Sequence, residues 1–182
     1  MHLLICPGYH SPDLTHDFLQ ALLRRITPER LWVMPIGSIP GSVSWPSRHA
    51  PLSQQQPLNV IAFSAGVVAA YPWLMTWQRQ GGKSRFIAID GWGMPLLGNL
   101  AIYRMSHDRW THGTTYFPTP KESKGYFYAD PAVEHLEIWQ FPQKTWGIGT
   151  IGDEPQSMTA IDFVYAVLTN KTLLTDGAVD AR

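Results

Sequence analysis

The sequence contains a single cysteine, Cys6, among its 182 residues. One thiol cannot form a disulfide within the chain, and no CxxC pair or zinc-ligand spacing occurs, so a disulfide framework and a cysteine-based metal site are excluded. Cys6 ends an apolar run, which is typical of a small buried hydrophobic residue and fits a reducing compartment.

A net charge is missing as well, because 14 Lys and Arg residues balance 14 Asp and Glu residues. Nucleic acids and anionic membrane surfaces attract basic patches, so the composition argues against both partners. The longest apolar stretch, residues 60–75, is interrupted by polar and helix-breaking residues and is shorter than the roughly 20 residues that span a bilayer. The N-terminal stretch MHLLICPGYH is broken too early by Pro7 and Gly8 to be a signal peptide. We therefore expect a cytoplasmic protein without a membrane span.

Phosphate-binding motifs are also lacking, since neither G-x-G-x-x-G nor G-x-x-x-x-G-K-[ST] follows any apolar segment. This makes a dinucleotide or nucleoside triphosphate site a poor hypothesis. No cofactor and no metal ion are expected.

What the sequence does contain is a regular alternation of short apolar segments and amphipathic segments. Buried parallel strands form such apolar runs, and the alternation predicts an α/β three-layer sandwich around a mostly parallel sheet of about six strands. We expect one domain over residues 1–170 and a frayed tail over 171–182. Strands are predicted at 2–6, 31–36, 58–63, 85–90, 100–106 and 136–141, helices at 11–25, 64–80 and 153–168, a long loop at 37–56, and mixed structure at 114–135.

Polar side chains cluster in the sequence where these predicted strands end. Ser64 follows the third strand, Asp90 ends the fourth, and the loop HDRWTH, residues 107–112, follows the fifth. Ligands of open parallel sheets bind outside the carboxyl ends of the strands. A hydroxyl, imidazoles and carboxylates at one edge are the groups that nucleophilic catalysis with a general base requires.

The stretch A-F-S-A-G around Ser64 is the most specific of these signals. A nucleophile elbow places a serine on a sharp turn between a strand and a helix, usually in the pattern G-x-S-x-G. Ala62 stands where the first glycine is usual and is small enough for the turn. The alternative is that Ser64 only caps the helix that follows it.

On these residues the sequence resembles the α/β-hydrolase fold, in a short form without a large lid, over roughly residues 1–169. The resemblance implies that Ser64 is the nucleophile and that the backbone N–H groups of Tyr9 and Ala65 form the oxyanion hole. It places the triad acid at Asp108, with Asp90, one strand earlier, as the alternative.

The histidine of the triad is less obvious from the sequence. In that family it follows the last core strand, and no histidine follows the predicted strand 136–141. His112 lies far enough along its loop to fold back toward Ser64, so we expect it to be the general base, with His107 as a weaker candidate. His135 precedes the predicted last strand and is expected to be structural.

Two functions follow from this interpretation. The first is an esterase-like serine hydrolase that cleaves an ester or related acyl bond of a small apolar or aromatic substrate, with His10, Trp92 and Trp110 lining the pocket. The second is a catalytically inactive hydrolase-like scaffold that binds a ligand or a partner protein, which an incomplete triad would favour. Neither function specifies an oligomeric state.

Overall fold

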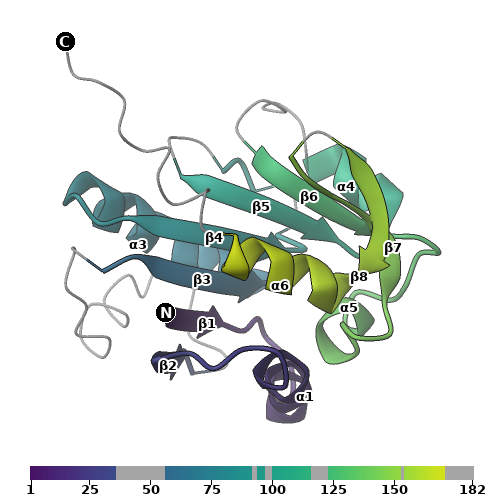
Figure 1. Cartoon of the computed structure of the whole chain (residues 1–182), viewed down its shortest axis with the longest axis horizontal. Coiled ribbons are helices and arrows are strands. Elements are labelled where there is room, and N and C mark those ends of the chain that lie inside the picture. The colour runs from purple at the N-terminus through teal and green to yellow at the C-terminus, as the bar shows by residue number, and fades with distance from the viewer. Residues whose placement is uncertain (36–55, 92–93, 97–99, 116–122, 153, 171–182) are drawn as a thin grey trace.

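A computed structural model shows that the chain folds around one mixed β-sheet (Figure 1). It describes residues 1–35, 56–91, 94–96, 100–115, 123–152 and 154–170. The predicted loop at 37–56 and the predicted tail at 171–182 therefore lie almost wholly or wholly outside the described residues. The strands of the sheet are β1 (His2–Cys6), β2 (Arg30–Val33), β3 (Leu58–Phe63), β4 (Ser84–Ile89), β5 (Ala101–Ser106), β6 (Ser123–Ala129), β7 (Trp146–Ile151) and β8 (Pro155–Thr159).

The spatial order of the strands is β2-β1-β3-β4-β5-β6-β7-β8. The strands from β2 to β6 pair in parallel, whereas β7 pairs antiparallel with both β6 and β8. The α/β class and the mostly parallel sheet are thus confirmed, and the expectation of about six strands was too low. All six parallel strands end at one edge of the sheet, which lies to the right in Figure 1.

Helices cover both faces of the sheet. Side chains of α1, α5 and α6 share one buried cluster with alternate strand residues such as Leu3 and Ile5. The opposite strand residues, including Leu4 and Cys6, pack with α3 in a second cluster. Burial on both faces explains why these strands are continuous apolar runs. The helices are α1 (Pro12–Leu23), α3 (Ala65–Arg79), α4 (Arg109–Thr115), α5 (Glu137–Gln140) and α6 (Ala160–Thr169).

The predicted strand at 136–141 is wrong, because this segment forms the short helix α5. The N–H of Gln140 donates to the carbonyl of Leu136 at 2.9 Å, which is the helical pattern. Its buried side chains, Ile138 and Trp139, are adjacent in sequence rather than alternating. The last parallel strand is β6, in the segment expected to be mixed.

The C-terminal part of the sheet was also mispredicted. The helix expected over 153–168 begins only at Ala160, because residues 155–159 form the edge strand β8. Thr159 is the N-cap of α6, and its hydroxyl accepts a hydrogen bond from the N–H of Asp162 at 3.2 Å. The strand β7 was not predicted, since its two glycines hide the apolar pattern.

Two predicted helices are confirmed with small differences at their ends. The helix predicted over 11–25 is α1, which begins at Pro12 directly after Ser11, although the Ser11 side chain makes no capping hydrogen bond. The helix predicted over 64–80 is α3, which runs from Ala65 to Arg79 and continues through Pro72. In the part of the chain that the structure describes, no helix has the length and apolar character needed to cross a membrane.

Candidate active site

Ser64 lies on a sharp turn between β3 and α3. Its backbone has φ 52° and ψ −124°, a conformation that is unusual for a residue other than glycine and stores strain. The N–H of Ser64 donates to the carbonyl of Ile89 on β4 at 2.8 Å, which ties the turn to the sheet. The side chain makes no capping hydrogen bond to α3. The hydroxyl is therefore available for another partner, and the capping alternative does not describe it.

Small residues let neighbouring segments approach this turn closely. A Cβ atom on Gly66 would lie 2.0 Å from the carbonyl oxygen of Cys6, so α3 can start against β1 only with glycine there. A Cβ atom on Gly8 would lie 2.9 Å from the Cβ atom of Ser64, so the loop after β1 passes directly beside the serine. Ala62 is fully buried in the cluster beneath α3, where its methyl group is accommodated.

The imidazole beside Ser64 belongs to His135. Its Nε2 atom lies 3.2 Å from the Oγ atom of Ser64. Its Nδ1 atom lies 2.9 Å from Oδ2 of Asp90, whose side chain is fully buried. A carboxylate can only accept, so Nδ1 carries the proton and Nε2 is left to accept a hydrogen bond from the serine hydroxyl. Ser64, His135 and Asp90 thus form a hydrogen-bonded chain, which we call the triad.

His135 was expected to be structural because the wrong segment was taken for the last core strand. The last parallel strand is β6, which ends at Ala129, and His135 follows it after a short turn. The missed signal is the alternation of buried and partly exposed residues along 125–129, where glycine and tyrosine take the places of aliphatic residues.

His112, the expected general base, lies elsewhere. It belongs to α4, and its ring centroid is 4.7 Å from that of Tyr126 and 5.1 Å from that of Tyr128. Burial, with the nearby charges of Arg104 and Arg109, lowers the pKa of His112 to about 4. The structure therefore places His112 against β6, and the imidazole that reaches Ser64 is that of His135.

Asp90 is held rigidly at the end of β4. Its backbone also has a positive φ of 50°, and its N–H donates to the carbonyl of Met105 on β5 at 2.8 Å. Oδ2 accepts a second hydrogen bond, from Nδ1 of His107 at 2.8 Å, and Oδ1 accepts from the backbone N–H of His107 at 3.0 Å. Burial alone would raise the pKa of Asp90, but the hydrogen bonds from His107 and His135 outweigh it and keep the pKa below its ordinary value. Asp90 is therefore an ionised carboxylate at neutral pH.

Asp108, the first choice for the acid, has other partners. Its carboxylate accepts a hydrogen bond from the N–H of Thr111 and so caps the first turn of α4. Its Oδ2 atom lies 3.3 Å from Nε2 of His107. Of the two acids weighed from the sequence, Asp90 is the one that contacts the imidazole next to Ser64.

The two residues whose amides were expected to form the oxyanion hole lie on segments next to Ser64. Ala65 is the first residue of α3, and the first N–H of a helix has no partner within it. Tyr9 belongs to the loop that Gly8 brings beside Ser64, and the residue is 85% exposed.

The three residues expected to line the pocket lie in different surroundings. The ring of His10 lies 5.7 Å from that of Phe63 and 6.2 Å from that of Trp139, and burial lowers its pKa. Trp110 is 76% exposed on α4, and Trp92 lies outside the described residues. His10 alone of the three is shown beside residues that adjoin the triad.

Stacked rings, which we call the aromatic column, support His135. Phe18 on α1 stacks on Trp139 of α5 with ring centroids 3.8 Å apart, and Trp139 stacks on Phe63 at 5.1 Å. Phe63 precedes Ser64 and stacks on the imidazole of His135 at 4.8 Å. The column therefore joins the nucleophile turn and the base through one packed unit.

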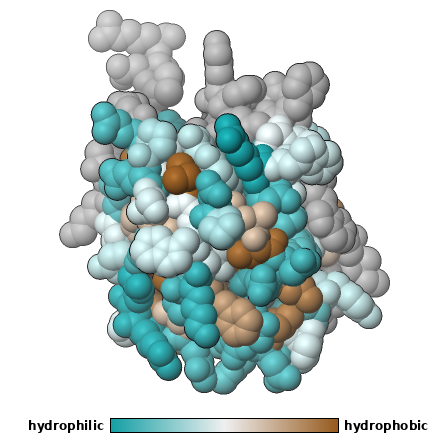
Figure 2. Space-filling view, turned by 90° about the vertical axis from the view of Figure 1, so that its right-hand side faces the viewer, coloured by the Kyte–Doolittle hydropathy of each residue, from teal (hydrophilic) through white to brown (hydrophobic). Residues whose placement is uncertain are grey.

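The surface over these strand ends is mixed in character. Figure 2 turns the right-hand side of Figure 1, toward which the parallel strands point, to the viewer. Hydrophilic side chains cover much of the coloured surface, and hydrophobic ones form separate spots. Polar groups are thus available around the edge where the triad lies.

The group Asp90, His107 and His135 also has a composition found in metal sites, with one potential ligand atom from each within 4.8 Å of the others. Each Nδ1 atom already lies at direct hydrogen-bond distance from the same carboxylate oxygen. A zinc ion needs about 2.0–2.2 Å to every ligand and would have to replace both hydrogen bonds. The two hydrogen bonds from the histidines to Asp90 account for the arrangement, and we assign no metal to it.

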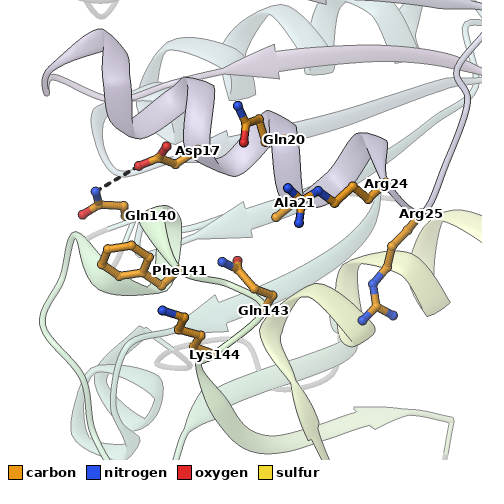
Figure 3. Close-up of a pocket in the computed structure, with 9 residues that line it drawn as sticks. All are labelled: Asp17, Gln20, Ala21, Arg24, Arg25, Gln140, Phe141, Gln143 and Lys144. Carbon is orange, nitrogen blue, oxygen red and sulfur yellow. Dashed lines mark hydrogen bonds between the residues drawn. The ribbon is translucent and has the colours of Figure 1, made fainter.

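A hollow of about 360 Å³ lies between α1 and the segment after α5 (Figure 3). Asp17 of α1 accepts a hydrogen bond from Gln140 of α5 at 3.0 Å along one side of it. Arg24, Arg25 and Lys144 contribute positive charge to its lining. None of the lining residues belongs to the triad, and they include no hydroxyl or thiol nucleophile, so we assign no chemistry to this hollow.

No protein-family model matches the chain, and no curated protein is significantly similar to it.

Proposed function

We propose that the protein is a serine hydrolase that cleaves a carboxylic ester or a related acyl bond. The observation that carries the proposal is the hydrogen-bonded chain from Ser64 Oγ through His135 to the buried Asp90. A serine becomes a nucleophile when a correctly oriented base can take its proton, and a carboxylate on the far nitrogen fixes that orientation. The strained backbone of Ser64 at a strand–helix turn supports the same role.

In the first step, Oγ of Ser64 attacks the carbonyl carbon of the substrate while its proton moves to Nε2 of His135. The imidazolium that forms is stabilised by the carboxylate of Asp90. The tetrahedral intermediate then expels the alcohol, which takes the proton from Nε2, and an acyl-serine remains. Water then attacks the acyl carbon while Nε2 of His135 takes one of its protons. The acyl–Oγ bond breaks as Nε2 returns that proton to Oγ, and the carboxylic acid leaves Ser64 as a free hydroxyl.

The developing oxyanion needs hydrogen-bond donors, which we assign to the backbone N–H groups of Tyr9 and Ala65. Ala65 supports this role because it lies at the positive end of the α3 dipole. A donor aimed at the oxyanion typically contributes about 3–4 kcal/mol to the stability of the transition state. The proposed substrate is a small apolar or aromatic ester, because His10 and Phe63 bring aromatic surface to the turn.

Labelling with a fluorophosphonate probe tests the proposal, because the probe reacts with activated serines. We expect the wild-type protein to be labelled, and we expect Ser64→Ala and His135→Asn to abolish labelling. Ser11→Ala, at an exposed serine before α1, is the matched control and should be labelled like the wild type. Turnover of p-nitrophenyl acetate then measures hydrolysis by the same variants.

The competing function is the inactive scaffold that binds a ligand or a partner protein. A folded wild-type sample, verified by circular dichroism, that the probe does not label would refute the hydrolase and favour the scaffold. Labelling that persists in Ser64→Ala would refute the assignment of the nucleophile.

A further inference from the structure

Asp90 accepts hydrogen bonds from two histidines, and only one of them faces the serine. Oδ2 of Asp90 receives Nδ1 of His135 at 2.9 Å and Nδ1 of His107 at 2.8 Å. A triad needs a single imidazole on its acid. The second imidazole therefore calls for its own explanation.

The two imidazoles differ in what lies at their other nitrogen. Nε2 of His135 meets the hydroxyl of Ser64, which can donate. Nε2 of His107 lies 3.3 Å from Oδ2 of Asp108, and Nδ1 of the same ring faces Asp90. Carboxylates cannot donate, so both nitrogens of His107 are satisfied only when both carry a proton. The geometry therefore favours an imidazolium at His107, because both of its nitrogens face carboxylate oxygens.

His107 also controls where the carboxylate of Asp90 points. Its backbone N–H donates to Oδ1 at 3.0 Å and its ring Nδ1 donates to Oδ2, so His107 hydrogen-bonds to both carboxylate oxygens. The Asp90 side chain has no exposed surface, and a buried carboxylate requires a charged or hydrogen-bonding partner to stay ionised. His107 supplies that partner without drawing on the proton of His135.

We propose that His107 is a positioning residue, a cationic clamp between Asp90 and Asp108 that holds the Asp90 carboxylate in the orientation that His135 requires. The inference rests on the proposed hydrolase function for its catalytic consequence, whereas the clamp itself is independent of that function. The charged or titratable groups around the ring are Asp90, Asp108, Glu134 and His135. The hydrogen bond to Asp90, followed by the charges of Asp90, Asp108 and Glu134, raises the pKa of His107 above its ordinary value despite partial burial.

The first experiment reads the protonation of His107 directly and needs no activity. Imidazole ¹⁵N and ¹³C resonances of the full chain are followed by NMR against pH, with His107→Asn used to assign the His107 signals. We expect both ring nitrogens of His107 to be protonated at neutral pH. We also expect Asp108→Asn to lower the titration midpoint of His107. A neutral His107 at pH 7, or a midpoint that Asp108→Asn leaves unchanged, overturns the clamp.

The second experiment measures fluorophosphonate labelling rates for two substitutions of His107. His107→Ala removes the ring donor, and we expect labelling to slow about 10- to 100-fold, as the loss of a charge-assisted hydrogen bond predicts. In His107→Asn the amide nitrogen overlies Nδ1 and can still donate to Asp90, so most of the rate should return. A rate for His107→Ala equal to that of the wild type overturns the positioning role.

The dependence of the labelling rate on pH separates this role from a merely structural one. Deprotonation of His107 at Nε2 leaves its Nδ1–H on Asp90 and so keeps the carboxylate in place. It removes a positive charge beside His135, which opposes the imidazolium that forms on His135 during attack, so the wild-type rate should rise a second time above neutrality. His107→Asn cannot titrate there and should lack this second rise. If His107→Ala does not fold, the dependence of the labelling rate on pH in His107→Asn is the test of the clamp. A second rise in rate that persists in His107→Asn refutes it. Failure of the wild type to be labelled refutes the hydrolase, and the NMR experiment still tests the clamp.

Discussion

The substitution Asp90→Asn tests the triad most sharply, because the surroundings of Asp90 restrict how an amide can fit. Oδ1 accepts from the backbone N–H of His107, and Oδ2 accepts from the rings of His107 and His135. If the amide oxygen takes the Oδ1 position, its NH₂ group faces both rings as a donor. His135 must then move its proton to Nε2, and it can no longer accept the proton of Ser64.

The opposite orientation of the amide keeps His135 in the correct tautomer at a calculable cost. The NH₂ group then faces the N–H of His107 and leaves a buried donor without a partner, which costs about 1–3 kcal/mol. Replacing a charged acceptor with a neutral one costs about 1 kcal/mol more at the hydrogen bond from His135. The sum of about 2–4 kcal/mol corresponds to a labelling rate roughly 30- to 1000-fold lower.

The assay for this prediction is the second-order rate constant of fluorophosphonate labelling near neutral pH, with circular dichroism to verify folding. Asp108→Asn is the matched control, since Asp108 was the rival acid and contacts only His107 among the histidines discussed. Its carboxylate is partly exposed, so we expect its rate to fall by at most about fivefold. A rate for Asp90→Asn within threefold of the wild type, or a larger loss in Asp108→Asn, would refute the assignment of Asp90 as the acid.

Two further predictions concern the elbow and the displaced histidine. Gly66→Ala places a methyl group 2.0 Å from the backbone oxygen of Cys6, so it should lower the free energy of unfolding by about 1–3 kcal/mol. The measurement is the midpoint of urea unfolding, and an unchanged midpoint would contradict the close packing of α3 on β1. His112→Asn should leave labelling by Ser64 unchanged, and an abolished label would restore His112 as the base. His112 titrates at about 4 when folded and near 6.5 when unfolded, so as pH falls below 6.5 the unfolded chain binds the proton first. The free energy of unfolding should therefore fall more between pH 6.5 and pH 4 in the wild type than in His112→Asn. Urea titrations that show equal losses in the two proteins would contradict the lowered pKa of His112.

The sequence alone was sufficient for the features that depend on neighbouring residues. Apolar runs over β1, β3, β4 and β5 identified strands buried on both faces. The A-F-S-A-G stretch located the turn at Ser64, because a strand, a sharp turn and a helix are all local structures. The nearness of Gly66 and Gly8 to the turn agrees with the small residues that such a turn needs.

The sequence failed where apolar pattern and structure disagree. In β6 the buried positions include Gly125, and the alternate positions are tyrosines, so the strand does not show the usual aliphatic alternation. In α5 the adjacent Ile138 and Trp139 resemble part of a strand, although they are buried against α1 by one helical turn. Because α5 was taken for the last strand and β6 was missed, His135 was predicted to precede the last strand, although it follows the last parallel strand.

The partners of Ser64 were decided only by the tertiary structure. Asp90 follows β4 and His135 follows β6, and 45 residues separate them in the chain. They meet because parallel strands end at the same edge of the sheet, and because the imidazole of His135 stacks on Phe63, the residue before the serine. His112 and Asp108 satisfied the same sequence criteria, but α4 turns His112 onto β6 and uses Asp108 as its cap. Residue type and strand order restrict which histidines and carboxylates can be partners of Ser64. Only the packing of the loops selects among them, because a hydrogen bond requires its two atoms to lie about 3 Å apart.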